Sequence, residues 1–183
     1  MKKLMYVLPI ILVVIIVLGV VNTPSHEINI QTDNLLRIHI RANSNQEIDQ
    51  DVKYEIKDEF VNFLTPLVAE CESKEEAIVI ISQNASKLEH IADEVLKKHN
   101  FSYASKVKIK KEYFPTRKYE NYVVESGVYD SVIVELGQAV GNNWWCVIYP
   151  PLCFTNFSTN PQNVVYKSKI MEIINKFFSK EQS

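Results

Sequence analysis

The sequence predicts an α+β fold: a mixed or antiparallel sheet of about four to five strands, with a helical hairpin packed on one face and a C-terminal helix. Apolar and polar residues alternate near residues 35–41 and again in several runs between residues 103 and 149. Two long stretches between these regions repeat apolar residues every three or four positions. The first spacing is typical of strands and the second of amphipathic helices. Strands grouped apart from helices favour α+β over an alternating α/β order.

The first 21 residues form an export segment. Lys2 and Lys3 precede 18 residues without a charge, Leu4–Val21, which is close to the length needed to cross a bilayer. No clean pair of small residues marks a cleavage site, so residues 1–21 are either a signal peptide or an N-terminal membrane anchor. Both alternatives place a polar spacer (22–34) and a single α+β domain (35–178) outside the cytoplasm.

The first strand follows the spacer. Its apolar residues Leu36, Ile38 and Ile40 share one face, and the polar residues between them share the other. This pattern predicts a half-buried strand. His39 belongs to the polar face and is therefore predicted to be a surface residue.

Two helices should come next. Ser44 followed by Glu47 is a capping-box pattern, and apolar residues then recur as far as Leu67. Pro66 should kink or stop this helix near Leu64. A second capping box, Ser73–Glu76, opens a helix that runs to about Lys98. The short connection between them predicts an antiparallel helical hairpin.

The remaining strands and the last helix are read from the second half of the chain. Valine and isoleucine alternate with lysines after Tyr103, until Pro115 interrupts the pattern. The further elements expected are strands at 119–124, 129–136 and 144–149, and a helix at 164–178.

The last of these strands carries an unusual composition. Trp144 and Trp145 follow a Gly-Asn-Asn turn, and Pro150-Pro151 ends the strand because proline has no N–H to donate. Adjacent residues point to opposite faces of a strand, so at most one tryptophan is expected to be free for a partner. The segment is either a core strand with a large aromatic content or a docking surface.

Three cysteines leave one without a partner. Cys146 and Cys153 flank a chain reversal and could form a disulfide in an exported domain, which would leave Cys71 free. The alternative is two reduced, half-buried thiols.

Known catalytic motifs are absent from the sequence, as are metal-ligand spacings and nucleotide-binding loops. We therefore predict no catalytic residues, no metal and no cofactor. A net charge of −2 gives no reason to expect a nucleic-acid partner. The alternative to a binding protein is an exported cell-wall or peptide hydrolase that uses Cys146, with His39 and Asp49 as participants.

Two segments carry a resemblance to a known family. The first is Leu36–Ser44, followed by Asp49-Gln50 and the helix with Lys57-Asp58, and the second is Gly141–Phe154 with its Asn-Trp-Trp-Cys and Pro-Pro-Leu-Cys runs. In this order, after an export signal, they resemble the stage II sporulation protein R family of endospore-forming bacteria. The resemblance covers roughly residues 35–157, and Phe114–Tyr119 also fits it.

The resemblance implies an intercompartmental signal. Proteins of this family are exported from the forespore into the space between the forespore and mother-cell membranes, secreted or membrane-anchored. There they activate a membrane-embedded protease of the mother cell, which processes a sigma-factor precursor. The family supplies no catalytic residues to carry over.

A signal of this kind needs a surface for its partner. Tryptophan anchors dominate many interfaces, so the residues first expected to contact the protease are Trp144, Trp145, Pro150, Pro151 and Leu152. A second group expected there is Arg41, Asn43 and Ser44.

Overall fold

The computed structural model describes residues 28–30, 34–119, 122–152 and 163–181. Within these residues a four-stranded sheet has the order β3-β6-β2-β7. Its strands are β2 (Leu36–Arg41), β3 (Ser105–Phe114), β6 (Gly127–Leu136) and β7 (Asn143–Tyr149). β2 is parallel to β6 and antiparallel to β7, and β3 is antiparallel to β6. The sheet is therefore mixed, as the sequence predicted.

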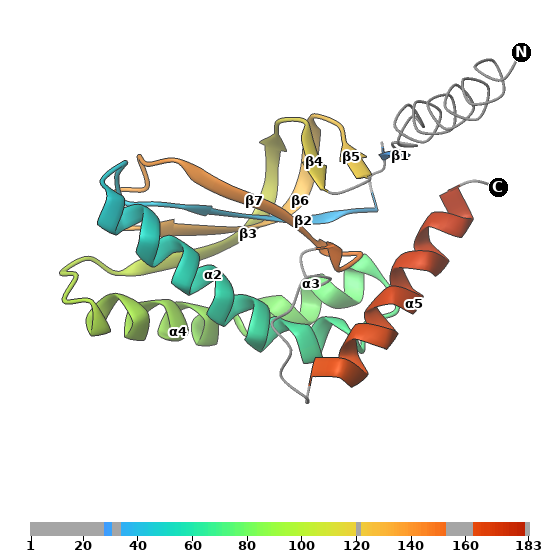
Figure 1. Ribbon diagram of the computed structural model, residues 1–183, viewed down its shortest axis with the longest axis horizontal. Helices are drawn as coiled ribbons and strands as arrows, with labels where there is room; N and C mark the ends of the chain where they lie inside the picture. Colours follow the sequence, from blue (N-terminus) through green and yellow to red (C-terminus); the bar gives the residue numbers. More distant parts are fainter. Residues whose placement is uncertain (1–27, 31–33, 120–121, 153–162, 182–183) are drawn as a thin grey trace, which may run out of the picture.

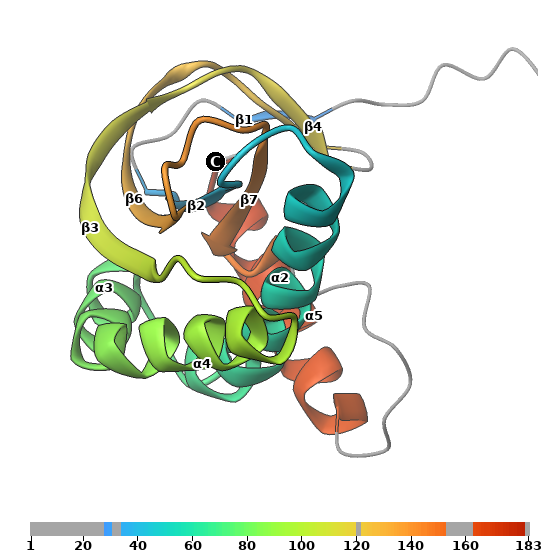
Figure 2. The ribbon, with the colours of Figure 1, turned by 90° about the vertical axis from the view of Figure 1, so that its left-hand side faces the viewer.

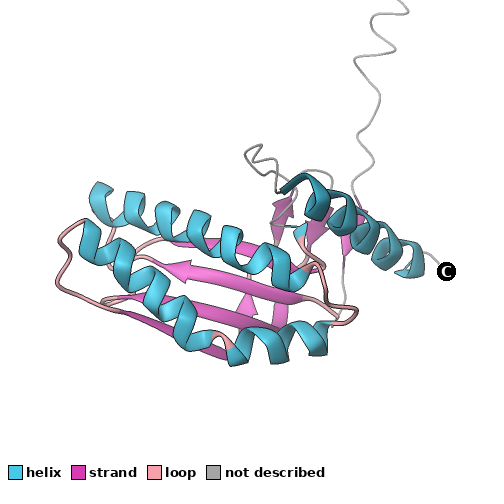
Figure 3. Cartoon of the chain, turned by 90° about the horizontal axis from the view of Figure 1, so that it is seen from below, coloured by secondary structure: helices cyan, strands magenta, loops and turns pink. Residues whose placement is uncertain are grey.

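The helices cover one face of this sheet (Figures 1 and 3). They are α2 (Glu47–Val68), α3 (Lys74–Gln83) and α4 (Ala85–Lys98). The predicted helical hairpin is confirmed, but its second arm is interrupted at Asn84, whose amide side chain donates to the Ile80 carbonyl. The C-terminal helix α5 (Asn163–Glu181) lies at the end of the sheet, beside the end of α2.

Two local predictions about α2 need correction. The helix does not stop near Leu64 but continues to Val68, because Pro66 lies in the last turn and Ala69 N–H still donates to the Thr65 carbonyl. A proline there removes only one backbone hydrogen bond. Ser44 does not cap the helix either. The N-cap is Gln46, and the Ser44 hydroxyl is engaged with Asp49 instead.

A smaller sheet covers the opposite face. It contains β1 (Ile28–Ile30), β4 (Arg117–Tyr119) and β5 (Tyr122–Val124) in the order β1-β5-β4. β1 falls inside residues 22–34, for which the sequence indicated only a polar spacer. The β4 and β5 strands divide the predicted strand at 119–124. Figure 2 shows β3 and β6 curving round this side of the molecule.

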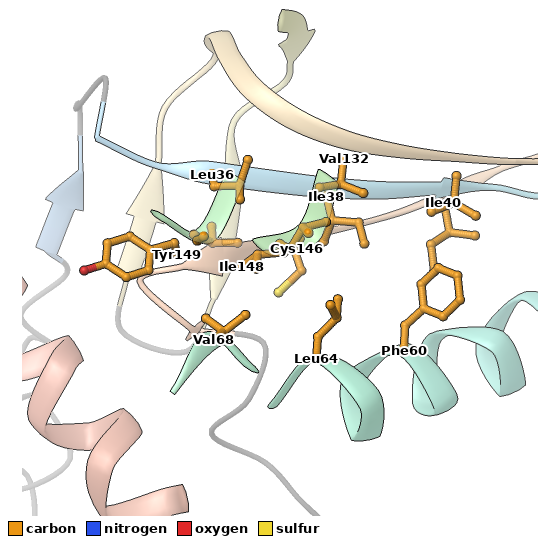
Figure 4. Packing of buried hydrophobic residues seen from close by; sticks show 14 of the residues in the cluster. Leu36, Ile38, Ile40, Phe60, Leu64, Val68, Val132, Cys146, Ile148 and Tyr149 are labelled. Carbon is orange, nitrogen blue, oxygen red and sulfur yellow. The ribbon is translucent and has the colours of Figure 1, made fainter. Parts of the chain in front are cut away.

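The principal core lies between the four-stranded sheet and the helices. Ile38 and Ile40 of β2 face Phe60 and Leu64 of α2 (Figure 4). Each of these four side chains is at most 3% exposed. Burying such a side chain contributes about 1.5–3 kcal/mol relative to leaving it in water.

The second face of β2 is also buried, which the sequence did not predict. Arg37 and His39 are both fully buried. His39 was predicted to lie at the surface, and that prediction is wrong, because the aromatic side chains of Phe114 and Trp145 pack on its ring with centroids 5.2 and 4.6 Å away.

Among the described residues, no helix has the length and apolar character required to cross a bilayer. The predicted export segment, residues 1–21, lies outside the described part of the chain. Its role remains a prediction.

Candidate functional site

The two segments predicted to bind a partner lie side by side. In the antiparallel register of β2 and β7, Arg41 pairs with Asn143 and Ile40 pairs with Trp144. The loops that follow β2 and precede β7 therefore meet at one end of the sheet. We call residues 42–46 and 137–142 the loop pair. The sequence identified both segments but could not show that they are neighbours.

Four hydrogen bonds hold the loop pair together. Gly141 N–H donates to the Ala42 carbonyl at 2.9 Å, and Val140 N–H donates to the Asn43 carbonyl at 3.4 Å. Gln138 N–H donates to Asn43 Oδ1 at 2.9 Å. Asn142 N–H donates to Asn45 Oδ1 at 2.7 Å. Asparagine suits these positions because its short amide side chain bonds readily to nearby backbone groups.

Asp49 anchors the loop pair to the first turn of α2. Its carboxylate accepts hydrogen bonds from Asn43 Nδ2 at 2.9 Å, from Ser44 Oγ at 2.5 Å and from the Tyr103 hydroxyl at 2.6 Å. Burial alone would raise the pKa of Asp49, but the hydrogen bonds from Ser44, Tyr103 and Asn43 lower it. Asp49 is therefore a charged, fully bonded structural anchor. Burial raises the pKa of Tyr103, and the hydrogen bond to Asp49 and the charge of that carboxylate raise it further.

A buried lysine fastens the loop pair from the other side. Lys53 is 1% exposed, and its ammonium donates to Gln50 Oε1 at 2.6 Å and to the Asn142 carbonyl at 3.1 Å. Burial lowers the pKa of this lysine. The sequence pattern did not single out Lys53, because a lysine in the middle of an amphipathic helix usually indicates a solvated face.

Trp144 and Trp145 point to opposite faces, as the strand pattern predicted. Trp144 lies on the helix side, next to Lys57 and Phe60 of α2. Trp145 lies on the other side, where the Arg117 guanidinium is 5.5 Å from its ring centroid. Both tryptophans are half-buried and pack against the core. Each keeps some surface that a partner could reach.

The other predicted contact residues are less accessible. Pro150, Pro151 and Leu152 are all buried. Their burial limits what a partner could touch in this conformation. Arg41 is half-buried and forms ion pairs with Glu112 and with Glu135, the latter at 3.4 Å. Cys153 lies outside the described residues, so its pairing with Cys146 stays a prediction.

The hydrolase alternative required Cys146, His39 and Asp49 to converge, and the structure separates them. Cys146 pairs with Ile38 and so shares its face, whereas His39 points to the opposite face. Asp49 belongs to α2 and is saturated by the loop pair. Burial and the charge of Arg41 lower the pKa of His39 from 6.5 to about 4. At neutral pH His39 is a neutral ring in an aromatic cluster, far from the arrangement of a nucleophile and its base.

Sequence reasoning missed two exposed apolar side chains, one in the loop pair and one beside it. Val140 is 69% exposed and Ile48 is 53% exposed. Val140 sits between Ala139, which has a φ of +55°, and Gly141. The sequence signal for Val140 was an apolar residue within a run of turn-forming Gly, Asn and Gln residues. A loop that holds a strained residue and several hydrogen bonds, yet leaves a valine in solvent, is suited to contact another protein.

Within the described ranges, no group of three or more His, Cys, Asp or Glu side chains could hold a metal ion. The loop pair, with Ile48 beside it, thus forms a surface of apolar and amide groups at one end of the sheet, which we call the end surface. Such a surface can bind another molecule, while none of its groups is placed to act as a nucleophile with a neighbouring base.

The comparisons with known proteins agree with the resemblance carried by the motifs. The model of the family described as stage II sporulation protein R matches residues 32–159. Stage II sporulation protein R of Bacillus subtilis (strain 168) is 37% identical over 126 residues, which cover 69% of this chain and 56% of that protein. The chain thus matches a little over half the length of this relative. No solved structure matches the chain. Because the matched region contains both segments of the loop pair, β2 to β7 and the helices between them, the chain belongs to the stage II sporulation protein R family.

Proposed function

We propose that this chain is an exported signal between the two compartments of a sporulating cell. It leaves the forespore, reaches the space between the forespore and mother-cell membranes, and activates a membrane-embedded protease of the mother cell. That protease then processes a sigma-factor precursor. The observation that carries the proposal is the family match over residues 32–159, which includes both motif segments.

The end surface formed by the loop pair supports a binding role. Its backbone is fixed by hydrogen bonds before any partner arrives, so little conformational entropy is lost when it binds. Val140 and Ile48 offer apolar contact area, and Trp144 is the second residue of β7, next to the loops. The loop pair lies at the opposite end of the sheet from β1, into which the N-terminal segment leads (Figure 1).

Export would also suit the cysteines. In an oxidising compartment Cys146 and Cys153 would form a disulfide next to Pro150-Pro151 and fix the end of β7. Tethering through residues 4–21, if they are not removed, would raise the effective concentration of the domain near the opposite membrane. Modest affinity for the protease would then suffice.

Reconstitution tests the proposal directly. The chain would be expressed with the candidate protease and the sigma-factor precursor in a host that does not sporulate, and precursor cleavage would be followed by immunoblot. Cleavage should require the chain. Cleavage at the same rate without it would refute the activating role.

Two surface variants test the end surface in the same assay. Val140→Asp and Ile48→Asp each place a charge where an apolar contact is proposed, and each should lower cleavage about tenfold or more, as loss of a central contact does. Val79→Asp is the matched control, because Val79 is 54% exposed on α3, away from the loop pair. Equal activity of all three variants, with unchanged thermal unfolding, would remove the end surface from the proposal.

A further inference from the structure

A second surface lies at the other end of the molecule. A cavity of about 290 Å³ opens between the end of α2, β7 and α5. We call it the acidic pocket, and its lining residues are Ala69, Glu70, Cys71, Glu72, Tyr149, Glu172, Ile173, Lys176 and Phe177. Its volume is at the lower end of the range for small-molecule sites, about 300–1,000 Å³. It fits one long side chain better than a cofactor.

The floor of the acidic pocket is apolar. Ala69 and Cys71 are 1% and 2% exposed, and Ile173 and Phe177 of α5 are half-buried. Burial, together with the carboxylates of Glu76 and Glu70, raises the pKa of Cys71 to about 11, so its thiol is neutral. The floor thus offers contact to the methylene groups of a side chain and contributes no charge of its own.

The rim is acidic. Glu72 and Glu172 are exposed, and among the described residues neither carboxylate forms an ion pair. Lys176 is the one basic residue among those that line the pocket. The negative potential reaches inward, because after burial and Cys71 the carboxylates of Glu76, Glu75 and Glu72 raise the pKa of Tyr149.

The Tyr149 hydroxyl is the polar group at the base. Tyr149 is 7% exposed, and within the described chain its hydroxyl has no hydrogen-bond partner. Figure 4 shows the ring directed away from Cys146 and toward the side where α5 lies, with the oxygen leading. Tyr149 lines the pocket, and its hydroxyl is not one of the fully buried polar atoms. A donor that enters the pocket could therefore reach this oxygen.

An apolar floor, an acidic rim and an unused acceptor together define the occupant. We propose that the acidic pocket receives a lysine or arginine side chain from an extended basic segment of a protein partner. The methylene stem would lie on Ile173 and Phe177, and the cationic head would donate to the Tyr149 hydroxyl and to the carboxylates at the rim. Long basic side chains bind in this way, with the stem on apolar surface and the charge among polar groups. This inference goes beyond the proposed activation of a protease and does not depend on the loop pair.

Binding of short peptides to the full chain in neutral detergent tests the inference. The probes are three capped pentapeptides, Gly-Leu-X-Leu-Gly, in which X is lysine, arginine or norleucine. The methyl resonances of Ala69 and Ile173 report on occupancy. The lysine and arginine peptides should bind about tenfold more tightly than the norleucine peptide, and high salt should abolish the difference because it screens charge.

Two variants separate charge from shape. Glu72→Lys combined with Glu172→Lys should remove the preference for basic peptides. Its matched control is Glu59→Lys combined with Glu94→Lys, which changes the net charge equally in a hollow on α4 that Lys87 and Lys98 also line. Tyr149→Phe should weaken the basic peptides and leave the norleucine peptide unchanged.

Each outcome decides the inference. Equal binding of all three peptides would mean a merely apolar pocket, and loss of binding in the control would mean a non-specific charge effect; either would overturn it. Thermal unfolding of every variant shows that the fold is retained. Because the assay contains no protease, its failure would leave the proposed signalling role standing, and failure of the reconstitution would leave the pocket standing.

Discussion

Burial of the charged Arg37 side chain on the second face of β2 costs free energy, and the sequence pattern did not predict this burial. The Arg37 guanidinium lies 4.4 Å from the Phe114 ring centroid and 4.9 Å from that of Tyr129, and it donates to the Tyr119 hydroxyl at 3.1 Å. Its Nε and Nη1 atoms have no hydrogen-bond partner within the described part of the chain. Desolvating an unpaired charge costs several kcal/mol, and two buried cation–π contacts of about 2 kcal/mol each offset much of that cost. The aromatic side chains therefore take the place of a carboxylate.

His39 should make stability depend on pH. Its folded-state pKa is about 4 against 6.5 for the free side chain, so between these values the unfolded chain binds a proton that the folded chain excludes. Stability is therefore full above about pH 6.5 and falls as pH drops toward 4, by on the order of 3 kcal/mol. His39→Phe keeps an aromatic ring and removes this titration. Urea unfolding at several pH values should show a flatter profile for the variant, and identical slopes would contradict the assignment.

Gly141 should tolerate no side chain. A Cβ at this position would lie 2.2 Å from the Ser44 carbonyl oxygen, which is part of the backbone and cannot move alone. Gly141→Ala should therefore separate the two loops and cost about 1–3 kcal/mol, the range for overpacking. Gly127→Ala is the control, because its Cβ would meet only the Tyr129 ring, at 3.3 Å. The measurement is the midpoint of urea unfolding, and similar values for the two variants would count against the close approach.

At the scale of elements, a helix protects one outer strand of the sheet. β3 is an edge strand, and α4 covers part of its free side with acceptors. Glu89 accepts from Val107 N–H at 2.8 Å, and Asp93 accepts from Ser105 N–H at 2.7 Å. An edge with unpaired N–H groups can recruit another strand. The sequence predicted that the lysines of β3 protect one solvated face. They and these helix side chains together protect the edge from pairing with another strand.

Removing the Glu89 and Asp93 carboxylates should allow β3 to pair with the same strand of another copy of the chain. Glu89→Ala combined with Asp93→Ala frees the Ser105 and Val107 N–H groups, and the chain should then self-associate as its concentration rises. Glu94→Ala, on the exposed side of the same helix, is the control. Sedimentation velocity in neutral detergent measures the change. A double variant that stays in the same state as the control would show that the lysines alone protect the edge.

The whole molecule is organised by pairings between distant segments. β2 lies between β6 and β7, whose residues are about 90–110 positions away in the chain. Both of its faces are buried, one by the helices and the other by the aromatic cluster around Arg37. The N-terminal half therefore has no stable sheet of its own.

A truncated chain should expose this dependence. A fragment that ends at residue 100 retains β2 and the helices α2 to α4 but lacks β3, β6 and β7. It should show helical circular dichroism without a cooperative thermal transition, because β2 and the apolar face of the helices lose what they pack against. The full chain is the reference. A sharp transition in the fragment would mean that the helices form an independent core.

Some features of the fold depend on neighbouring residues alone, and others depend on residues far away in the chain. The positions of the main strands, the two capping signals, the helical hairpin and the opposite faces of Trp144 and Trp145 could be argued from neighbouring residues. The Ser73 cap is confirmed, since Ser73 Oγ accepts from Glu76 N–H at 3.2 Å, whereas the Ser44 cap is not. Ser44 matches the pattern equally well, but its hydroxyl bonds to Asp49, whose carboxylate also accepts from the distant Tyr103.

The amino-acid sequence by itself determined the types and order of the main elements and the family to which the chain belongs. Periodicity, caps and turn residues act over a few positions, and the family motifs are contiguous runs. The tertiary structure decided what covers each face: it buried Arg37 and His39, joined the loops around Asp49 and formed the acidic pocket between β7 and α5. The physical reason is that alternation states which side chains share a face, while strand partners and covering elements come from residues far away in the chain.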